Sequence, residues 1–575
     1  MKFPASLKIQ TVTAAVCFAV QCQANLVVTN KANSGPGTLR DALAQAQSGD
    51  IITFDITGLF TNRTTDLIIS NDVSIIGPGP GVLAVTGNSN SSPRIFTVLN
   101  GVTASVSGLT LRDCYAGSQA NGGAISNGGT LFLTNCVFLR CRAGSGMVPA
   151  APSAGGLPGG PGAHGGAIYN SGSLTVVNCN FYTNIAGLGG YGLAGPNGNG
   201  GDSGNGGAIY SSGTLLAMNC NFLTNVAPGG GAGGSGYLAP PTGTGSPDGS
   251  PGGNGGHGGA IYATGPAAFI NCAFGFNRAG SGGTAGSGIA GTSAHPTGGN
   301  GGPGGRGGDG GAIFSLGNLT LTSCTVATNL AGDGSAGGAA SSGYYTPGGN
   351  GGWGGGGGSG ALYCTGSADL TACTFYRNAV GAGGDGADGA TGGWGAGGGN
   401  GGYGGNSGRG PAIFGNTSNA LMTLHNVLVF QNFINDGGSG GWGGSGGGNT
   451  IYGKPGTNGL IFVVFDLSGM FTSLGHNFIH HSSGNTGFTN AIQGDIVNPD
   501  NGYVYLSQLG RYGGPTLTCP ISNPASLVFD AGDDAILASP NITADQRGFP
   551  RISGAHVDIG AFEMQMPTTP LVING

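Results

Sequence analysis

Hydrophobic positions in this chain follow the alternation of β-strands, in short runs that recur along its length. In one such run Leu174 and Val176 are separated by polar or outward positions, the period of two that is typical of a half-buried strand. Asn178 interrupts the phase, and the alternation resumes with Cys179 and Phe181. The pattern predicts two short strands joined by a corner of one residue.

The same unit recurs seven times. Each copy opens with Gly-Gly-Ala-Ile or a variant, which adds a third short strand. Each continues to a motif related to Asn-Cys-x-Phe-x-x-Asn, which is clearest at 178–184, 219–225 and 271–277. A unit of about 20 residues buries its apolar side only by stacking on its neighbours. The predicted fold is therefore all-β, a parallel β-helix. The openings lie at Gly122–Ile125, Gly165–Ile168, Gly206–Ile209, Gly258–Ile261, Gly310–Ile313, Ser359–Leu362 and Gly410–Ile413.

Stacking predicts ladders of identical residues, because equivalent positions in neighbouring coils lie about 4.8 Å apart. One ladder is expected at Cys136, Cys179, Cys220, Cys272, Cys324 and Cys373. A second is expected at a corner, where asparagine amides can bond along the stack and left-handed backbone is tolerated: Asn184, Asn225, Asn277, Asn329 and Asn378.

The cysteines admit two interpretations. They could form a disulfide or metal array in an exported protein, or a column of small buried thiols; their shared position favours the column. Four cysteines fall outside it, namely Cys114, Cys141, Cys364 and Cys519, of which Cys141 and Cys364 are the disulfide candidates. No paired Cys-x-x-Cys spacing predicts zinc.

Glycine-rich insertions separate the copies, which start 41–52 residues apart. Each insertion follows the asparagine corner, so all should leave one edge of the solenoid. Residues 298–311 repeat Gly-Gly-x, the period of the polyproline II helix. Two alternatives remain open: a sheaf of packed polyproline II helices, or flexible loops.

Aromatic residues are concentrated in these insertions. On an exposed edge they suit contacts with a polysaccharide or a surface protein; the alternative is that they fasten the insertions to each other or to the coils. The ligand-contact candidates are Trp353, Trp394, Trp442, Tyr191, Tyr237 and Tyr403, with Tyr344 and Tyr345 nearby.

The N-terminus has the features of a secretory signal, residues 1–24, with Lys2 and Lys8 before an apolar core at 11–20. We expect an exported protein with no transmembrane segment after cleavage. Residues 38–47 predict an amphipathic helix that caps the first coils, whose strands are expected at 67–69, 73–76 and 109–111. The predicted segments are 25–113 for cap and first coils, 114–435 for repeat coils, 436–563 for last coils and C-terminal cap, and 564–575 for the tail.

Charge is scarce, at 7% of residues with a net charge of −6, so no basic surface for nucleic acid is expected. Sugar cleavage on stacked coils needs carboxylates that project together. Within the repeat cores we find Asp369 alone, which predicts a non-catalytic body without a cofactor. The terminal group could hold calcium or an acid pair, but a salt-bridged cap is favoured: Asp530, Asp545, Arg547, Asp558 and Glu563. His476, His480 and His481 are expected in strand context rather than at a metal.

Both ends of the chain resemble a known family. The opening at 27–54 and the motifs at 513–516, 545–548 and 558–563 are similar to secreted choice-of-anchor Q domain proteins. The Gly-Gly-Ala-Ile and Phe-x-x-Asn pairs are similar to repeats of chlamydial polymorphic outer membrane proteins. The resemblance implies a right-handed, pectate-lyase-like β-helix at or beyond the cell surface. The expected function is a secreted or cell-surface, non-catalytic, adhesin-like or structural module. The alternative is a carbohydrate-active enzyme of lyase or hydrolase type.

Overall fold

A computed structural model describes residues 24–62, 64–87, 94–150, 156–238, 247–415, 421–448, 451–462, 465–482, 487–488, 492–499, 503–538 and 542–566. Within them, the strands form three parallel sheets, named A, B and C. Sheet A contains β1 (Asn25–Val28), β2 (Ile51–Phe54), β5 (Val73–Ile76), β8 (Thr103–Ser107), β11 (Thr130–Thr134), β14 (Ser173–Val177), β17 (Thr214–Met218), β20 (Ala267–Ile270), β23 (Leu319–Thr322), β26 (Ala368–Thr371), β29 (Met422–His425) and β32 (Phe471–Gly475).

Sheets B and C complete the solenoid. Sheet B contains β3 (Gly58–Thr61), β6 (Leu83–Thr86), β9 (Thr110–Arg112), β12 (Val137–Leu139), β15 (Asn180–Tyr182), β18 (Asn221–Leu223), β21 (Ala273–Gly275), β24 (Thr325–Ala327), β27 (Thr374–Tyr376), β30 (Leu428–Phe430), β33 (Phe478–Ile479) and β34 (Ile496–Val497). Sheet C contains β4 (Leu67–Ile69), β7 (Phe96–Val98), β10 (Ile125–Asn127), β13 (Ile168–Asn170), β16 (Ile209–Ser211), β19 (Ile261–Ala263), β22 (Ile313–Ser315), β25 (Leu362–Cys364), β28 (Ile413–Gly415) and β31 (Leu467–Ser468).

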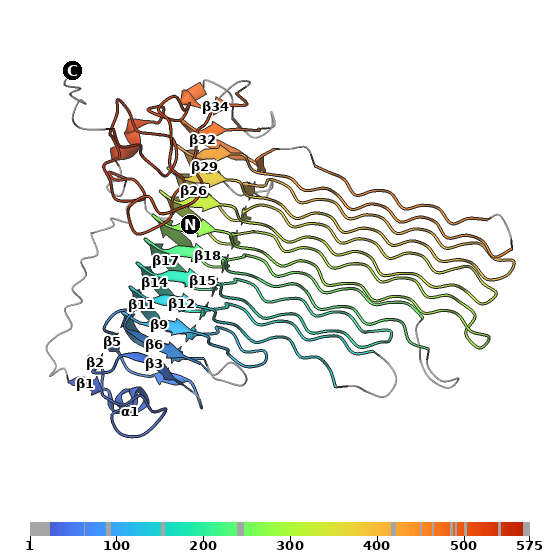
Figure 1. The fold of residues 1–575 in the computed structure, drawn as a ribbon, viewed down its shortest axis with the longest axis horizontal. Coiled ribbons are helices and arrows are strands. Elements are labelled where there is room, and N and C mark those ends of the chain that lie inside the picture. The colour runs from blue at the N-terminus through green and yellow to red at the C-terminus, as the bar shows by residue number, and fades with distance from the viewer. Residues whose placement is uncertain are drawn as a thin grey trace, which may run out of the picture.

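Each repeat coil passes through sheet C, then A, then B, and pairs in register with the next coil. Ile168 of β13 lies beside Ile209 of β16, and Phe181 of β15 beside Phe222 of β18. Strands that advance by one coil per turn make an all-β, right-handed parallel β-helix (Figure 1). The predicted fold class is confirmed.

The corner between sheets A and B is a single left-handed residue, as the interrupted alternation predicted. Asn178 has a φ of 53°. The second corner differs from the prediction, because the left-handed residue is Thr183, with a φ of 51°, and not Asn184. The side-chain amide of Asn184 instead points into the buried interior, where it forms hydrogen bonds along the stack.

The two glycines that open five of the seven repeats have different structural roles. Gly165 has a φ of +68°, a conformation that side chains rarely allow. Gly166 lies against the next coil, where a Cβ atom would come within 2.0 Å of the Gly207 carbonyl oxygen. Close packing of backbone on backbone therefore requires the second glycine.

The six predicted ladder cysteines lie in one buried column, all as free thiols. The Cys136 amide donates to the Cys179 sulfur at 3.3 Å, and each thiol donates to a backbone carbonyl, as Cys220 does to Met218 at 3.2 Å. Burial raises the pKa of the Cys272 thiol. The column consists of apolar packing groups, with cysteine small enough for the corner.

Cys141 and Cys364, the disulfide candidates, are also free and buried. The Cys141 amide donates to the Asn184 Oδ1 at 3.0 Å, so Cys141 belongs to the same column as the asparagine amides. Cys364 pairs with Ser315 in sheet C and donates to the Gly366 carbonyl at 3.3 Å. Both therefore occupy ladder positions that the sequence pattern did not reveal.

The asparagine amides form a continuous buried ladder. In each step the backbone amide and Nδ2 of one residue both donate to the Oδ1 of the next, at 2.9–3.1 Å. The same bonds continue from Asn378 to Asn432, which the sequence analysis did not assign. Beside it, Phe138, Phe181, Phe222 and Phe274 stack with ring centroids 4.6–4.9 Å apart.

The N-terminal helix α1 spans Leu39–Gln45 and is capped by Thr38, whose side chain accepts from the Asp41 amide. Leu39, Ala42 and Leu43 are buried against the first coils. The strands expected at 67–69 and 73–76 are β4 and β5, while that expected at 109–111 is β9, one residue later. An amphipathic helix at this end covers apolar groups that no further coil covers (Figure 1).

The insertions form an ordered sheaf that extends sideways from the β-helix (Figure 1). Each has an outgoing leg that leaves sheet B and a returning leg that enters sheet C, and their hydrogen bonds recur every third residue. Along the returning legs, Gly252 donates to the Pro303 carbonyl, Gly304 to Trp353 and Gly354 to Tyr403. The sheaf, as defined here, comprises the described residues of 143–164, 186–205, 227–257, 279–309, 331–359, 380–409 and 434–462.

A second set of bonds joins the two layers of legs, in a zigzag from Gly190 to Gly160, Gly201 to Gly190 and Gly231 to Gly201, each at 2.8 Å. The period of three matches packed polyproline II helices rather than flexible loops. The seventh insertion continues to 462, so the repeat region extends past the predicted boundary at 435. Its legs pair largely through backbone amides and carbonyls, which leave no hydrophobic pattern in the sequence to mark where the repeat region ends.

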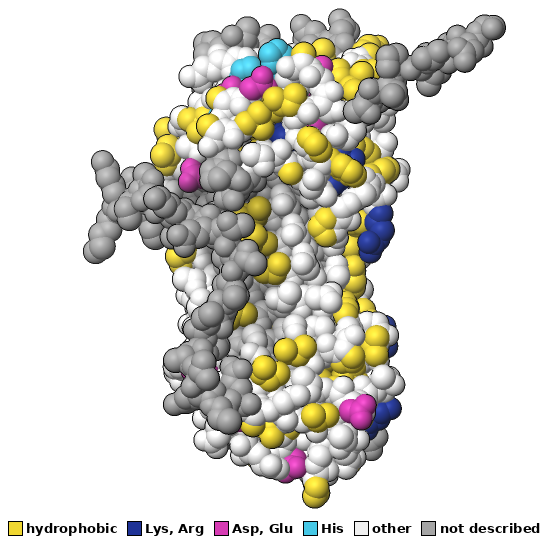
Figure 2. All heavy atoms as spheres, turned by 90° about the vertical axis from the view of Figure 1, so that its left-hand side faces the viewer, with side chains coloured by type: hydrophobic (Ala, Val, Ile, Leu, Met, Phe, Trp, Pro, Cys, Tyr) yellow, Lys and Arg dark blue, Asp and Glu magenta, His cyan; other side chains and the backbone are white. Residues whose placement is uncertain are grey.

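The C-terminal segment, 503–566, lies along the flank of the solenoid rather than across its end. Gln546 bonds to the Cys272 carbonyl at 3.2 Å, and the Ala561 amide donates to Thr374 at 2.9 Å, contacts on sheet B. The segment also contains the 3-10 helix η2 (Asp534–Ala538), and η1 (Ile492–Gly494) precedes it. The C-terminal segment covers apolar side chains on the outer face of sheet B, such as Tyr376 and Phe430, which are buried beneath it. Figure 2, viewed from the side away from the sheaf, shows the few charged side chains mostly toward the two ends and one edge.

Candidate ligand-binding hollow

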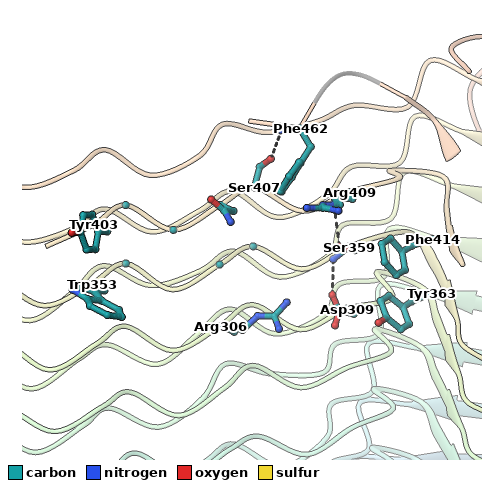
Figure 3. Close-up of a pocket in the computed structure, with 16 residues that line it drawn as sticks. Arg306, Asp309, Trp353, Ser359, Tyr363, Tyr403, Ser407, Arg409, Phe414 and Phe462 are labelled. Carbon is teal, nitrogen blue, oxygen red and sulfur yellow. Dashed lines mark hydrogen bonds between the residues drawn. The ribbon is translucent and has the colours of Figure 1, made fainter. Parts of the chain in front are cut away.

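A hollow of about 500 Å³ lies where the returning legs of the sheaf meet sheet C. Figure 3 shows its lining residues, which come from four successive insertions and two strands. Its walls are aromatic and its floor is polar backbone: Arg306, Asp309, Trp353, Gly354, Gly356, Gly357, Ser359, Tyr363, Tyr403, Gly404, Gly405, Asn406, Ser407, Arg409, Phe414 and Phe462.

One wall is part of an aromatic column on the outer face of sheet C. The residue after the Ile or Leu is aromatic in six of the seven repeats, and the rings of neighbours are nearly parallel with centroids 4.7–5.2 Å apart. Tyr363 and Phe414 end this column at the hollow. Burial raises the pKa of Tyr363, and nearby Asp309 adds to the shift. The column is Tyr169, Tyr210, Tyr262, Phe314, Tyr363 and Phe414.

The opposite wall is formed by Trp353 and Tyr403, at equivalent places on adjacent returning legs. Their ring centroids are 5.6 Å apart with planes inclined by 56°. Trp353 is 60% exposed and Tyr403 is 49% exposed. Two large aromatic side chains held on rigid backbone and open to solvent are a ready contact surface for a ligand.

The outward side chains of the returning legs form columns. Most of them accept a hydrogen bond from a backbone amide of the next leg. Asn300 accepts from the Asn350 amide, and Asn350 from the Asn400 amide, at 2.7 and 2.8 Å. Nearer the β-helix, Asp309 accepts from the Ser359 amide, and Ser359 from the Arg409 amide. These Asn, Asp and Ser side chains therefore stabilise the sheaf.

The columns between these two lack such acceptors in the hollow. Arg306 and Gly356 stand where other legs carry Asn or Asp, and Pro303 and Trp353 stand in the neighbouring column. No hydrogen-bond partner for the amides of Trp353, Gly356, Tyr403 or Asn406 occurs among the described residues. The floor of the hollow thus presents backbone donors.

The charged groups of the hollow are two arginines and one carboxylate. Arg306 and Arg409 are exposed, and within the described chain neither forms an ion pair. The Arg409 guanidinium lies over the Phe462 ring at 3.5 Å. Asp309 is buried beside His257 at 3.6 Å; burial raises its pKa and the histidine opposes that rise.

The other aromatic candidates lie apart from the hollow. Trp442 lies on an outgoing leg, where its amide donates to Asp388, and is 76% exposed. Trp394 is 82% exposed toward the end of its leg, and pairs with Gly447. Tyr191 and Tyr237 lie on outgoing legs of earlier insertions, and Tyr344 and Tyr345 contact each other edge to face. The structure therefore brings together only Trp353 and Tyr403 of the predicted contact residues.

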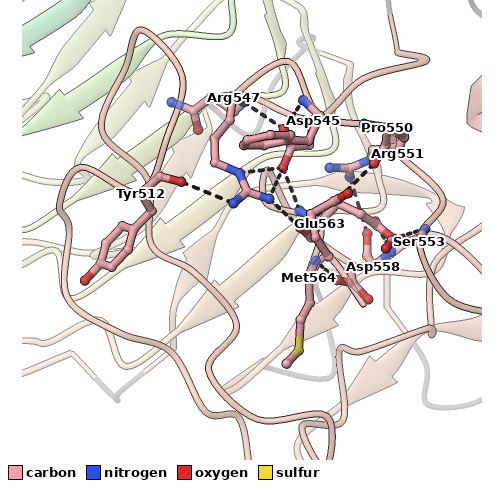
Figure 4. Close-up of polar contacts among 12 residues, drawn as sticks. Tyr512, Asp545, Arg547, Pro550, Arg551, Ser553, Asp558, Glu563 and Met564 are labelled. Atoms are coloured by element: carbon pink, nitrogen blue, oxygen red, sulfur yellow. Dashed lines mark hydrogen bonds and ion pairs between the residues drawn. The ribbon is translucent and has the colours of Figure 1, made fainter. Parts of the chain in front are cut away.

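The terminal charged residues form a buried network (Figure 4). Asp545 pairs with Arg547 at 2.7 Å and accepts from the Glu563 amide. Glu563 accepts from the Asp558 amide at 2.8 Å, and Asp558 accepts from the amides of Asp530 and Met564. Burial raises the pKa of Glu563 to about 8 and that of Asp558 to about 6.

This network holds the C-terminal segment together on the flank, and does not close the solenoid end as predicted. The fully buried Arg551 donates to the carbonyls of Asp558 and Gly560. Each carboxylate is engaged by amides or a guanidinium, so the network has the character of a structural core. Within the described residues, no group of three or more His, Cys, Asp or Glu side chains is placed to hold a metal ion.

The remaining residues considered in the sequence lie in structural positions. Asp369 is on the outer face of sheet A and accepts from Thr423 at 2.6 Å. His476 follows β32, and its Nδ1 contacts the Ala531 carbonyl at 2.8 Å; His480 follows β33. These histidines border strands rather than lie within them.

Several residues of the hollow escaped sequence analysis, in particular Arg306, Arg409 and Gly356. Their signal is visible only when the insertions are aligned by layer, about 50 residues apart. The aromatic column left a clearer signal, since an aromatic residue follows the first strand position in six copies.

No family model and no curated relative matches the sequence. Among solved structures, a pectate lyase is similar at 13% identity and a TM-score of 0.36, covering 94% of this chain and 96% of that chain. A PL6 family alginate lyase mutant is similar at 12% identity and a TM-score of 0.27, covering 96% and 59%. The β-helix assignment stands on the three sheets themselves. No helix of the described residues has the length and hydrophobicity to span a membrane.

Proposed function

We propose that this protein is a non-catalytic, adhesin-like β-helix that binds a polysaccharide in the hollow. The observation that supports this most is the pair Trp353 and Tyr403, two exposed rings on rigid legs beside a floor of backbone donors. Rings of this kind pack against the apolar faces of sugars, while amide donors bond to sugar oxygens. The sheaf supplies the rigidity that limits entropy loss on binding.

The carboxylates support binding rather than cleavage. Among the described residues, Asp309 is the one carboxylate that lines the hollow. Its Oδ1 already accepts from the Ser359 amide at 2.8 Å. Hydrolysis by the usual route uses two carboxyl groups on either side of the scissile bond. A hollow with one engaged carboxylate is better suited to holding a chain than to cutting it.

The proposal includes the location of the protein outside the cell and its relationship to known families. The signal-like segment 1–24 lies almost wholly outside the described residues and stays a prediction. The terminal motifs support membership of the choice-of-anchor Q proteins, and the repeats support likeness to chlamydial polymorphic outer membrane proteins. An exported, surface-associated β-helix agrees with a sugar-binding sheaf that extends away from the body.

The test is co-sedimentation of the purified chain from Asn25 with a panel of insoluble neutral and acidic polysaccharides, with new reducing ends measured in the same tubes. We expect binding without new ends, weakened by Trp353→Ala and Tyr403→Ala. Trp442→Ala is the matched control, because it removes a ring that is even more exposed, at 76%, from an outgoing leg outside the hollow. Absence of binding throughout, or equal loss in all three variants, would contradict the proposal; release of new ends would favour the enzyme alternative.

A further inference from the structure

In the hollow, amide donors without acceptors lie side by side on two successive returning legs. In most legs an outward Asn or Asp accepts the amide of the next leg, as Asn254 does for Arg306 at 3.1 Å and Asn406 for Leu460 at 2.8 Å. Arg306 offers no acceptor to Gly356, and Gly356 offers none to Asn406. Because Arg306 and Gly356 stand where other legs carry an acceptor, the amides of Gly356 and Asn406 are left without one.

The adjoining column repeats this feature. Pro303 precedes Trp353, and Trp353 precedes Tyr403, so neither preceding side chain can accept the next amide. Four amide donors thus face outward in a block two legs wide, with no partner among the described residues. An unpaired donor at a solvated surface is satisfied by water and remains available to a ligand acceptor.

Positive charge borders the same block. Figure 3 shows Arg306 below the leg that carries Trp353 and Ser359, and Arg409 above Ser359. A Cβ atom built on Gly356 would lie 3.7 Å from the Arg306 Nε, so the guanidinium borders the open floor directly. Asp309 is buried beside His257 and accepts a hydrogen bond from the Ser359 amide.

From this arrangement we infer that the hollow selects an acidic polysaccharide, whose carboxylates bond to Arg306, Arg409 and the open amides. This inference rests on the proposed function and adds the class of ligand. Guanidinium groups bind planar carboxylates with two donors at once, and converging backbone amides favour anions. The aromatic walls of Trp353 and Tyr403 on one side and Tyr363 and Phe414 on the other hold the sugar rings between them.

The experiment compares two ligands with the same sugar backbone, polygalacturonate and its fully methyl-esterified form. Binding is measured by calorimetry on the full chain from Asn25. We expect the ester to bind at least about tenfold more weakly, in line with the strength of charged hydrogen bonds. Added salt should weaken binding of the acid and leave the ester unchanged.

Three variants locate the interaction. Arg306→Gln and Arg409→Gln should each reduce binding of the acid about tenfold or more and change that of the ester little. Arg278→Gln is the matched control, since Arg278 pairs with Asp333 on an outgoing leg. Gly356→Asn fills the floor without strain, because no atom lies within 3.7 Å of the new Cβ, and its Oδ1 can take the Asn406 amide. We expect it to abolish binding and to keep or raise the melting temperature.

The outcomes separate the inference from the proposed function. Equal binding of acid and ester, both lost in Trp353→Ala, would overturn the acidic preference and leave the polysaccharide site in place. Binding of the acid that survives Gly356→Asn and both arginine variants would overturn the location. No binding of either ligand, with only neutral polysaccharides bound at Trp353, would likewise reject the acidic class and leave the polysaccharide site in place. No binding to any polysaccharide would reject both.

Discussion

The buried asparagine ladder should contribute more to stability than any exposed hydrogen bond of the sheaf, and Asn277→Ala tests this. The Asn277 Nδ2 donates to Asn329 Oδ1 at 2.9 Å and to the Phe222 carbonyl at 2.8 Å. Its Oδ1 accepts from both the amide and the Nδ2 of Asn225, at 3.0 Å each. Alanine removes four hydrogen bonds from a residue that is 1% exposed.

The magnitude follows from the groups that are left without partners. The backbone amide of Asn225 loses its acceptor, and the Asn225 Nδ2 loses one of its two, keeping the bond to the Phe181 carbonyl at 3.0 Å. Asn329 keeps the bond from the backbone amide of residue 277. Each buried donor hydrogen left without an acceptor costs about 1–3 kcal/mol, so the loss of two should cost roughly 2–6 kcal/mol. The cavity left by the shorter side chain adds to this loss of stability.

The assay is chemical denaturation followed by circular dichroism, with hydrogen exchange to locate the loss. A solenoid can unfold in parts, so exchange should rise most in the coils around β18, β21 and β24. The control is Asn350→Ala, which removes one exposed bond to the Asn400 amide and should cost less than about 1 kcal/mol. The reasoning is refuted if Asn277→Ala is no more destabilising than this control.

Further tests address the sheaf, its base and the thiols. Gly305→Ala should speed amide exchange across the sheaf, because its Cβ would meet the Gly253 carbonyl at 2.0 Å, whereas Gly356→Ala should not; equal exchange in both would contradict backbone packing. Burial lowers the pKa of His257, whose Nδ1 accepts from the Asp309 amide at 2.9 Å. Below about pH 6.5 the unfolded chain therefore binds more protons and stability falls as pH falls; melting curves of His257→Asn should show a weaker decline, and an unchanged slope would argue against this role. The buried thiols, Cys272 among them, should resist alkylation until denaturant is added, and rapid labelling of the native protein would disprove their burial.

Local pattern determined the β-helix. Alternation and recurrence fixed the strands, because a coil of about 20 residues has one way to bury its apolar face and identical neighbours to bury it against. The same reasoning placed Cys272 and Asn277 in columns, and Thr38 at the start of a capping helix. It also identified Trp353 and Tyr403 as exposed candidates.

Tertiary structure alone decided the sheaf, the flank position of the C-terminal segment and the hollow. Glycine-rich legs carry no hydrophobic pattern, so their order comes from backbone bonds between residues about 50 apart. The Gln546 contact with Cys272 joins positions still further apart in sequence. The roles of Arg306 and Gly356 can be recognised only by comparison with neighbouring legs, where the same position carries an acceptor. A missing acceptor depends on the residues of two successive legs and not on one residue.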